Sequence, residues 1–342
     1  MRRSVPALTL AAVAAAGCGG GSPSGPDATP VPSSPVNGFV FYDENGNGTA
    51  DPSETVRLPS VGVAVGGVTG STTTGGRFAL SSVPNGAQTA QARPEALPAY
   101  FTPGAAVSVT VPPAGDVAIP AVLPLGGRAR ANVYLAFGDS ITAGDGSSDG
   151  SGYVDELQAD LRSFWGQATV EGDGQWGTKS NKGAGRLPAS LGYVHPAYVL
   201  ILYGTNDWND AECRDAFPCY TIDSLRSMVD QTRGAGGFPI LGTIPPVNPA
   251  YTDRGATERN DWVKRMNDEV RAMAKQENVA IAEIHGEFTK QASLPPFFAD
   301  YLHPNDAGYR LLSRAFFVAI TNPLSAAGAS RRTLFFPPFG GH

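Results

Sequence analysis

Residues 131–320 alternate between short apolar runs and segments in which apolar side chains recur at helical spacing. Such alternation predicts a parallel sheet with helices on both faces, a three-layer α/β domain. In the first helical segment the repeat is carried by Val154, Leu157, Leu161 and Phe164. Five strands are expected, at 133–137, 168–170, 198–203, 239–244 and 279–284. Ligands of these sheets bind beyond the carboxyl ends of the strands, so functional side chains should directly follow strands.

The preceding residues 37–124 have a different pattern. Apolar and polar residues alternate within short segments such as "SVGVAVGG" and "AVSVTV", which are separated by turn-forming residues. This pattern predicts a small, antiparallel, all-β sandwich. A chain of 342 residues with 42% hydrophobic residues is long enough to form both domains.

The N-terminus has the features of a targeting segment. Arg2 and Arg3 precede an apolar stretch, residues 5–16, that is too short to span a bilayer, so residues 1–17 are expected to be a secretory signal. The "AAGC" at 15–18 resembles a bacterial lipobox, which implies an exported protein anchored by a lipid on Cys18 to the outer face of a membrane. Cleavage after Ala16 would instead give a secreted chain.

Two further segments carry no functional motif. Residues 18–36 are mostly Gly, Ser and Pro and are expected to be a disordered linker. Residues 321–342 are expected to form a C-terminal tail without an assigned role.

The sandwich segment contains "DENGNGTADPSE", residues 43–54, which matches the calcium loop D-x-N-x-N-G-x5-E. Gly48 would permit the sharp turn, and the alternative is a polar hairpin loop, because Asn-Gly pairs form turns. With "VPNGAQTAQA", the segment resembles the calcium-binding B-type and carboxypeptidase-regulatory-like modules of surface proteins, which implies a structural calcium ion. The oxygen ligands would come from Asp43, Asn45, Asn47, Thr49, Asp51 and Glu54.

Charge and cysteine content narrow the class of protein. The net charge of -6 provides no basic surface for nucleic acid. Cys213 and Cys219 form a pair in a turn-rich loop and are expected to bridge in an oxidising compartment, the alternative being two unpaired thiols. Closing so short a loop would stabilise the fold by about 2 to 2.5 kcal/mol in the chain-entropy model.

Four polar motifs lie where the predicted sheet should place a site. "GDSITAG" follows the first strand, "NKGAG" lies in the expected loop at 181–185 after the second, "GTND" follows the third, and "DYLH" precedes the last helix. In this order the motifs resemble the four blocks of the SGNH, or GDSL-type, hydrolases. The resemblance spans residues 131–320 and implies a flavodoxin-like fold with a five-stranded parallel sheet. Because no G-x-S-x-G surrounds Ser140, an ordinary α/β-hydrolase is disfavoured.

The residues of these motifs could perform acyl transfer without a cofactor. The Ser140 hydroxyl needs a base, which His303 can provide if Asp300, three residues earlier, orients its ring. His285 is the competing base, whereas His195 is expected to be structural. The resemblance assigns the oxyanion donors to the Ser140 N–H, to the N–H of Gly185 with Gly183 as the alternative, and to the Asn206 amide.

The sequence therefore predicts an exported serine esterase that hydrolyses carboxylic (acyl or acetyl) esters through a Ser-His-Asp triad. The alternative is a surface binding or adhesion protein with a vestigial hydrolase domain. The substrate stays open between acylated carbohydrates, lipids and aryl esters. Trp176 and Trp208 are candidates either for stacking on a sugar ring or for ordinary packing.

Overall fold

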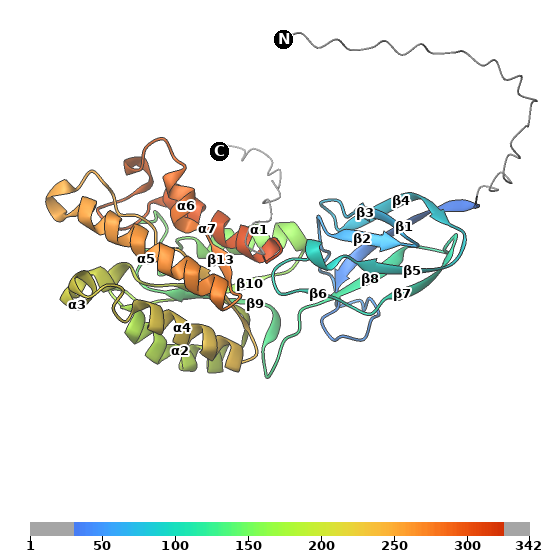
Figure 1. Ribbon diagram of the computed structural model, residues 1–342, viewed down its shortest axis with the longest axis horizontal. Coiled ribbons are helices and arrows are strands. Elements are labelled where there is room, and N and C mark those ends of the chain that lie inside the picture. Colours follow the sequence, from blue (N-terminus) through green and yellow to red (C-terminus); the bar gives the residue numbers. More distant parts are fainter. Residues whose placement is uncertain (1–30, 325–342) are drawn as a thin grey trace, which may run out of the picture. The chain divides into compact units, whose positions relative to one another are not determined.

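The computed structural model describes residues 31–324 (Figure 1). The predicted signal, Cys18, most of the linker and the tail beyond residue 324 lie outside the described residues. All described helices and strands belong to one compact unit that begins at Ser33. Among residues 31–324, no helix combines the length and the apolar character needed to cross a membrane.

The second half of the chain is built on a sheet of five parallel strands. The strand order is β10-β9-β11-β12-β13, which is the flavodoxin-like order, and the direction of winding reverses between β9 and β11. The strands are β9 (Arg130–Gly138), β10 (Thr169–Gly174), β11 (Pro196–Leu202), β12 (Phe238–Gly242) and β13 (Ala280–Ala282). Every residue of β11 is buried, as expected for a central strand covered on both faces. The predicted fold class is confirmed.

Helices cover both faces of this sheet and complete three layers (Figure 1). Successive side chains of β9 point to opposite faces, so Ala136 packs with one helical layer and Leu135 with the other. One layer contains α1 (Val154–Trp165), α6 (Ile284–Thr289) and α7 (Asp306–Thr321), and the other contains α2 (Ser180–Val194), α4 (Thr221–Gly234) and α5 (Ala256–Gln276). The shorter helices are α3 (Ala211–Asp215), η1 (Pro94–Ala96), η2 (Thr205–Asn209), η3 (Thr252–Arg254) and η4 (Pro295–Phe297).

The first half of the chain forms two four-stranded sheets, in the orders β4-β1-β8-β6 and β3-β2-β5-β7. The strands are β1 (Ser33–Tyr42), β2 (Gly62–Val65), β3 (Val68–Ser71), β4 (Arg77–Pro84), β5 (Gly86–Ala92), β6 (Thr102–Pro103), β7 (Val107–Val111) and β8 (Val117–Val122). The prediction of wholly antiparallel pairing was wrong, because β1 and β8 pair in parallel. The chain reaches β8 only after crossing the other sheet, and so long a connection permits a parallel return.

The first strand also begins earlier than expected. Residues 33–36, which the sequence assigned to the linker, are part of β1, where Ser33 pairs with Pro84 of β4. Val36 is fully buried in the sandwich core. Burial of this one apolar side chain and pairing with β4 outweigh the linker-like composition of the segment.

Two tyrosines join the sandwich to the parallel sheet at the amino ends of its strands. The Tyr198 hydroxyl donates to the carbonyl oxygen of Ala99 at 2.8 Å. The Tyr100 hydroxyl donates to the carbonyl oxygen of Pro239 at 2.6 Å and accepts the N–H of Ala280 at 2.8 Å. These contacts leave the carboxyl ends of the strands, where the polar motifs lie, free of the sandwich.

Candidate active site

Ser140 lies in a tight turn directly after β9. A Cβ atom at Gly138 would lie 2.0 Å from the Thr142 hydroxyl oxygen and 2.7 Å from the Leu202 carbonyl oxygen, so only glycine fits where the strand ends. The Asp139 carboxylate accepts the N–H of Ile141 at 3.0 Å and closes the turn. This geometry places Ser140 at the carboxyl edge of the sheet, beside the point where the strand order reverses.

His303 and Asp300 are brought to Ser140 by the loop that precedes α7. His303 Nε2 lies 3.0 Å from Ser140 Oγ, and its Nδ1 lies 2.9 Å from Asp300 Oδ2. The other Asp300 oxygen accepts the N–H groups of Leu302 and His303, both at 2.7 Å. Burial raises the pKa of Asp300, but the hydrogen bonds from His303 and Leu302 outweigh it and leave that pKa below its ordinary value. An ionised Asp300 can hold the proton on Nδ1, so that Nε2 is free to accept the serine proton.

Neither of the other two described histidines lies in this position. His285 is the second residue of α6, where its N–H donates to the Thr243 hydroxyl at 2.9 Å, and burial lowers the pKa of its ring. His195 ends α2 in the left-handed conformation, at φ 52°, directly before β11 begins and therefore at the opposite edge of the sheet. Of the histidines in the described part of the chain, His303 is thus the one placed to act on Ser140.

Asn206 follows β11 within η2, and its side-chain amide lies between two segments of the site. Its Nδ2 donates to Asp139 Oδ2 at 3.2 Å and to the Thr178 carbonyl oxygen at 3.3 Å. Arg259 of α5 is buried and donates to the Thr205 carbonyl oxygen at 2.5 Å. This hydrogen bond fixes the first residue of η2. The amide is therefore held at the same edge of the sheet as Ser140.

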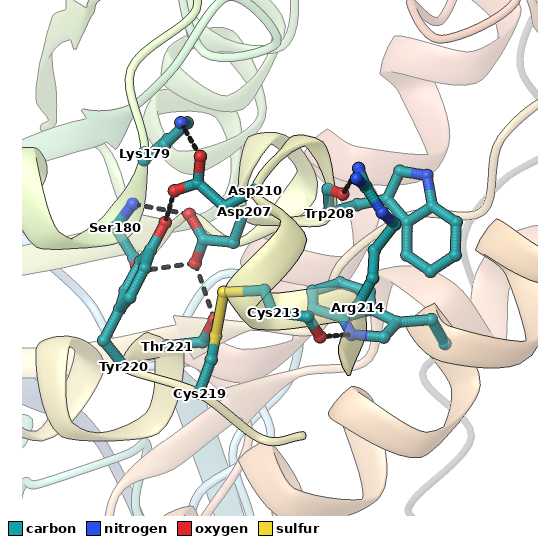
Figure 2. The surroundings of a disulfide bond; sticks show 11 residues. Lys179, Ser180, Asp207, Trp208, Asp210, Cys213, Arg214, Cys219, Tyr220 and Thr221 are labelled. Atoms are coloured by element: carbon teal, nitrogen blue, oxygen red, sulfur yellow. Dashed lines mark hydrogen bonds and ion pairs between the residues drawn. A yellow bond between two sulfur atoms is a disulfide. The ribbon is translucent and has the colours of Figure 1, made fainter. Parts of the chain in front are cut away.

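A buried carboxylate organises the segment that carries Asn206 (Figure 2). Asp207 accepts the N–H of Ser180 at 2.9 Å, the Ser180 hydroxyl at 2.6 Å and the Thr221 hydroxyl at 2.7 Å. Burial raises the pKa of Asp207, although these hydrogen bonds oppose the shift. Asp207 thereby ties the first residues of α2 and α4 to η2.

The two cysteines brace the same segment (Figure 2). Cys213 of α3 and Cys219, just ahead of α4, are joined in a disulfide with their Cα atoms 4.9 Å apart. Beside them, Asp210 accepts hydrogen bonds from the Lys179 ammonium group and from the Tyr220 hydroxyl. The chain after Asn206 is thus held by one covalent bond and by one charged cluster.

The expected loop at 181–185 was wrong, because α2 already begins at Ser180. The Gly183 N–H donates to the Lys179 carbonyl oxygen at 2.9 Å, and Gly185 lies further along the helix with an exposed surface. N–H groups beyond the first turn of a helix are used by the carbonyl groups four residues earlier. Neither glycine is therefore placed to offer a free N–H to an oxyanion.

The turn after β10 contains a backbone N–H group that is not used by a helix. Gly177 has φ 68°, a conformation that favours glycine, and the flanking Gln175 N–H donates to the Gly138 carbonyl oxygen at 3.0 Å. The N–H groups of Gly177 and Ser140 have no acceptor within residues 31–324. Gly177 was not predicted as a donor, because the resemblance placed that donor in the motif at 181–185; the second strand was also ended at residue 170, whereas β10 continues to Gly174. A glycine three residues beyond the true strand end was the available signal.

Asp139 is a buried titratable group of this arrangement, in contact with the Asn206 amide. It is 1% exposed, and this burial raises its pKa to about 7, with the nearby charge of Asp207 adding to the shift. The hydrogen bond from the Ile141 N–H acts in the opposite direction. The carboxyl group that holds the Asn206 amide therefore takes up a proton at a higher pH than an exposed aspartate does.

The two tryptophans near the site differ. Trp208 packs edge-on against Trp262 with ring centroids 5.9 Å apart, which is ordinary packing. Trp176 is 70% exposed at the turn after β10, beside Gly177, so its ring is available to a ligand.

Comparison with known proteins gives a family match for the part of the chain that contains this site. Residues 136–311, slightly more than half of the 342, match the model of the GDSL-like Lipase/Acylhydrolase family. Esterase TesA of Pseudomonas aeruginosa is 33% identical over 129 residues, which make up 37% of this chain. The match spans 62% of that relative, less than two thirds of its length.

Solved structures with a similar fold include a lipase/acylhydrolase from Enterococcus faecalis, with 23% identity and a TM-score of 0.48 over 56% of this chain and 95% of that one. They also include a catalytic mutant of an acetylxylan esterase from Geobacillus stearothermophilus, with 22% identity and a TM-score of 0.47 over the same shares of the two chains.

Proposed function

Because this chain belongs to the GDSL-like lipase/acylhydrolase family, a family of carboxylic ester hydrolases, we propose that it is a serine esterase acting through Ser140, His303 and Asp300. The observation that carries the proposal is the continuous series of contacts from Ser140 Oγ through the His303 ring to Asp300, at 3.0 and 2.9 Å. Such a series argues against a vestigial hydrolase domain. Turnover of p-nitrophenyl acetate by the purified full-length chain is the direct test.

The first half of the reaction transfers the acyl group to the enzyme. His303 Nε2 takes the proton of the Ser140 hydroxyl while Oγ forms a bond to the ester carbonyl carbon. As the tetrahedral intermediate collapses, the bond from that carbon to the alcohol oxygen breaks, and His303 gives the proton to the departing alcohol. Asp300 holds Nδ1–H throughout and stabilises the charged imidazole ring.

The second half releases the acid. A water molecule gives a proton to His303 as its oxygen attacks the acyl carbon, and the bond to Ser140 Oγ breaks as Oγ regains a proton. The products are one carboxylic acid, one alcohol and the enzyme in its original state.

Three donors would hold the negative charge on the carbonyl oxygen. These are the N–H groups of Ser140 and Gly177 and the side-chain amide of Asn206. The two free N–H groups and the placement of the Asn206 amide between Asp139 and Thr178 support this assignment. Donors already aimed at a developing charge lower the barrier without reorganising during the reaction.

Export and anchoring rest on the first 18 residues, which lie outside the described residues. We propose that the chain is exported and held by a lipid on Cys18 at the outer face of a bacterial membrane. The disulfide fits an oxidising compartment. Cys18→Ser should move the protein from the membrane fraction to the medium of an exporting bacterium. Wild-type protein found entirely in the medium would contradict the anchor and indicate secretion.

We also propose that residues 43–54 bind a structural calcium ion. Asp43 and Glu54 are each 2% exposed, which is unusual for carboxylates. Asp43 Oδ2 accepts the N–H of Gly48 at 2.8 Å, and Glu54 Oε2 accepts the N–H of Asp51 at 3.0 Å. These contacts fold the loop around its own first and last carboxylates.

Three of the remaining expected ligands contact one another within this loop. Asn45 Nδ2 and Asn47 Nδ2 both donate to Asp51 Oδ2, at 2.7 and 2.9 Å. Among residues 31–324, no group of three or more His, Cys, Asp and Glu side chains is placed to hold a metal ion, so the Asn amide oxygens and the Thr49 carbonyl would have to supply part of the shell. An all-oxygen donor set of this kind suits calcium.

Calcium should stabilise the full-length protein without changing its esterase activity. A ligand that binds only the folded state, at one hundred times its Kd, adds about 2.7 kcal/mol to the free energy of unfolding, so the Tm measured by calorimetry should rise. Asp51→Ala should abolish this rise, whereas Asp116→Ala, at an exposed carboxylate of the sandwich outside the loop, should preserve it. A Tm that does not change when calcium is added would contradict the proposed calcium site. Loss of activity on chelation, in protein that is still folded, would contradict its separation from catalysis.

A further inference from the structure

Asp145 is a second carboxylate beside the proposed catalytic histidine, and its backbone is held on both sides. Its N–H donates to the Ser140 carbonyl oxygen at 3.0 Å, and its own carbonyl oxygen accepts the hydroxyl of Tyr309, a buried residue of α7, at 2.6 Å. The next residue, Gly146, has φ 91°, and a Cβ atom there would lie 3.0 Å from His303 Cβ. The loop therefore has little freedom to move its side chain away from the site.

The Asp145 carboxylate faces the reacting side of His303. Its Oδ2 lies 3.4 Å from His303 Nε2, the same nitrogen that lies 3.0 Å from Ser140 Oγ. Asp300 contacts the other ring nitrogen, so the two carboxylates lie at opposite nitrogens of the ring. The Asp145 side chain is 33% exposed and makes no other polar contact within residues 31–324. It can therefore accept a hydrogen bond from a ligand.

In the proposed reaction, the alcohol part of the bound ester occupies the position next to Nε2. In the reaction proposed above, Nε2 delivers its proton to the departing alcohol oxygen, which must therefore come within hydrogen-bond distance of this nitrogen. A hydroxyl on the carbon next to the ester-bearing carbon would then lie beside Asp145. A negative group at the same place would meet a carboxylate in a partly desolvated setting and be repelled.

Resting on the proposed function, we infer that Asp145 makes the alcohol side of the site selective for esters of polyhydroxylated alcohols, the class that includes sugars. The carboxylate accepts a hydrogen bond from the hydroxyl vicinal to the ester oxygen. Among the three substrate classes consistent with the sequence, this favours acylated carbohydrates over aryl esters and over lipids whose alcohol has no free vicinal hydroxyl.

The test compares two acetate esters that differ by one hydroxyl group, ethyl acetate and 2-hydroxyethyl acetate. Both give the same acetyl-enzyme, so the ratio of their kcat/KM values reports only how the alcohol is recognised, and hydroxide-catalysed rates correct for intrinsic reactivity. A hydrogen bond to a charged acceptor predicts that the wild type favours 2-hydroxyethyl acetate by about 10- to 100-fold. Asp145→Ala should bring the corrected ratio close to one, and Asp145→Asn should give an intermediate ratio.

The controls separate this role from a structural one. A ratio measured within one variant does not depend on how much of the protein is folded. Asp149→Ala removes an exposed carboxylate of the same loop, which accepts hydrogen bonds from the N–H and the hydroxyl of Ser151, and should leave the ratio unchanged. The anionic ester acetoxyacetate should gain on ethyl acetate in Asp145→Asn, because the repelling charge is gone.

Two results would overturn the inference while leaving the proposed function intact. One is a wild type that hydrolyses both neutral esters without preferring 2-hydroxyethyl acetate, and the other is an Asp145→Ala variant that keeps the wild-type ratio. If the wild type hydrolysed neither of these esters nor p-nitrophenyl acetate, the proposed function itself would be wrong, and the inference with it.

Discussion

Replacing either Ser140 or His303 by alanine should lower kcat for p-nitrophenyl acetate by about 10⁴-fold or more, and the double variant should be little slower than either single one. The two side chains act on one proton, since His303 Nε2 lies 3.0 Å from Ser140 Oγ, so each is nearly useless without the other. Steady-state kinetics of the three purified variants, at equal concentrations of folded protein, measures the effect.

The competing histidine supplies the control for this prediction. His285→Ala should keep near-normal kcat, because the contact of this residue with Thr243 is made through its backbone N–H and survives the substitution. If His303→Ala retained activity while His285→Ala lost it, the assignment of the base would be reversed.

Asn206→Ala should lower kcat by about 100- to 1000-fold with only a modest change in KM, because the amide is expected to strengthen its hydrogen bond as the oxyanion forms. The substitution also removes a hydrogen-bond donor from buried Asp139, so some loss of thermal stability is expected. Kinetics should therefore be measured well below the Tm of the variant.

The neighbouring Asn209 gives a matched control. It ends the same short helix, its side chain is exposed, and only its backbone carbonyl oxygen accepts a hydrogen bond, from Arg214. Asn209→Ala should leave kcat within about twofold of the wild type, as expected for a surface substitution that removes no contact. An Asn206→Ala variant changed in KM alone would exclude this amide from the oxyanion hole.

The parts of the fold that the sequence predicted are those in which the local pattern and the burial agree. β11 is a run of buried residues, and Ser140 directly follows an apolar strand, so both could be placed from the sequence. The second strand was cut short because β10 lies at the edge of the sheet, and its last four residues, "EGDG", are not buried and show no apolar alternation. The oxyanion donor was misplaced for a separate reason, because the resemblance put it in the motif at 181–185, which lies within α2 and not in the turn at Gly177.

Other features depend on contacts between residues that are distant in the sequence. The parallel pairing of β1 with β8 joins Gly38 to Val117, and no local pattern specifies such a partner. In the sequence, nothing distinguishes Asp145 from the other polar residues of a Gly- and Ser-rich loop. Its position beside His303 arises only when α7 packs against that loop through Tyr309.

The tyrosine contacts at the amino ends of the strands bear on the order in which the chain folds as it is synthesised. All eight sandwich strands have been made once Val122 has left the ribosome, yet the partners of Tyr100 are Pro239 and Ala280, which emerge much later. Domains generally fold from the N-terminus during synthesis. The Tyr100 hydroxyl of the nascent sandwich therefore lacks its partners until more than a hundred further residues have been synthesised. The half of the protein that is synthesised first therefore gains the hydrogen-bond partners of Tyr100 only from the half that is synthesised last.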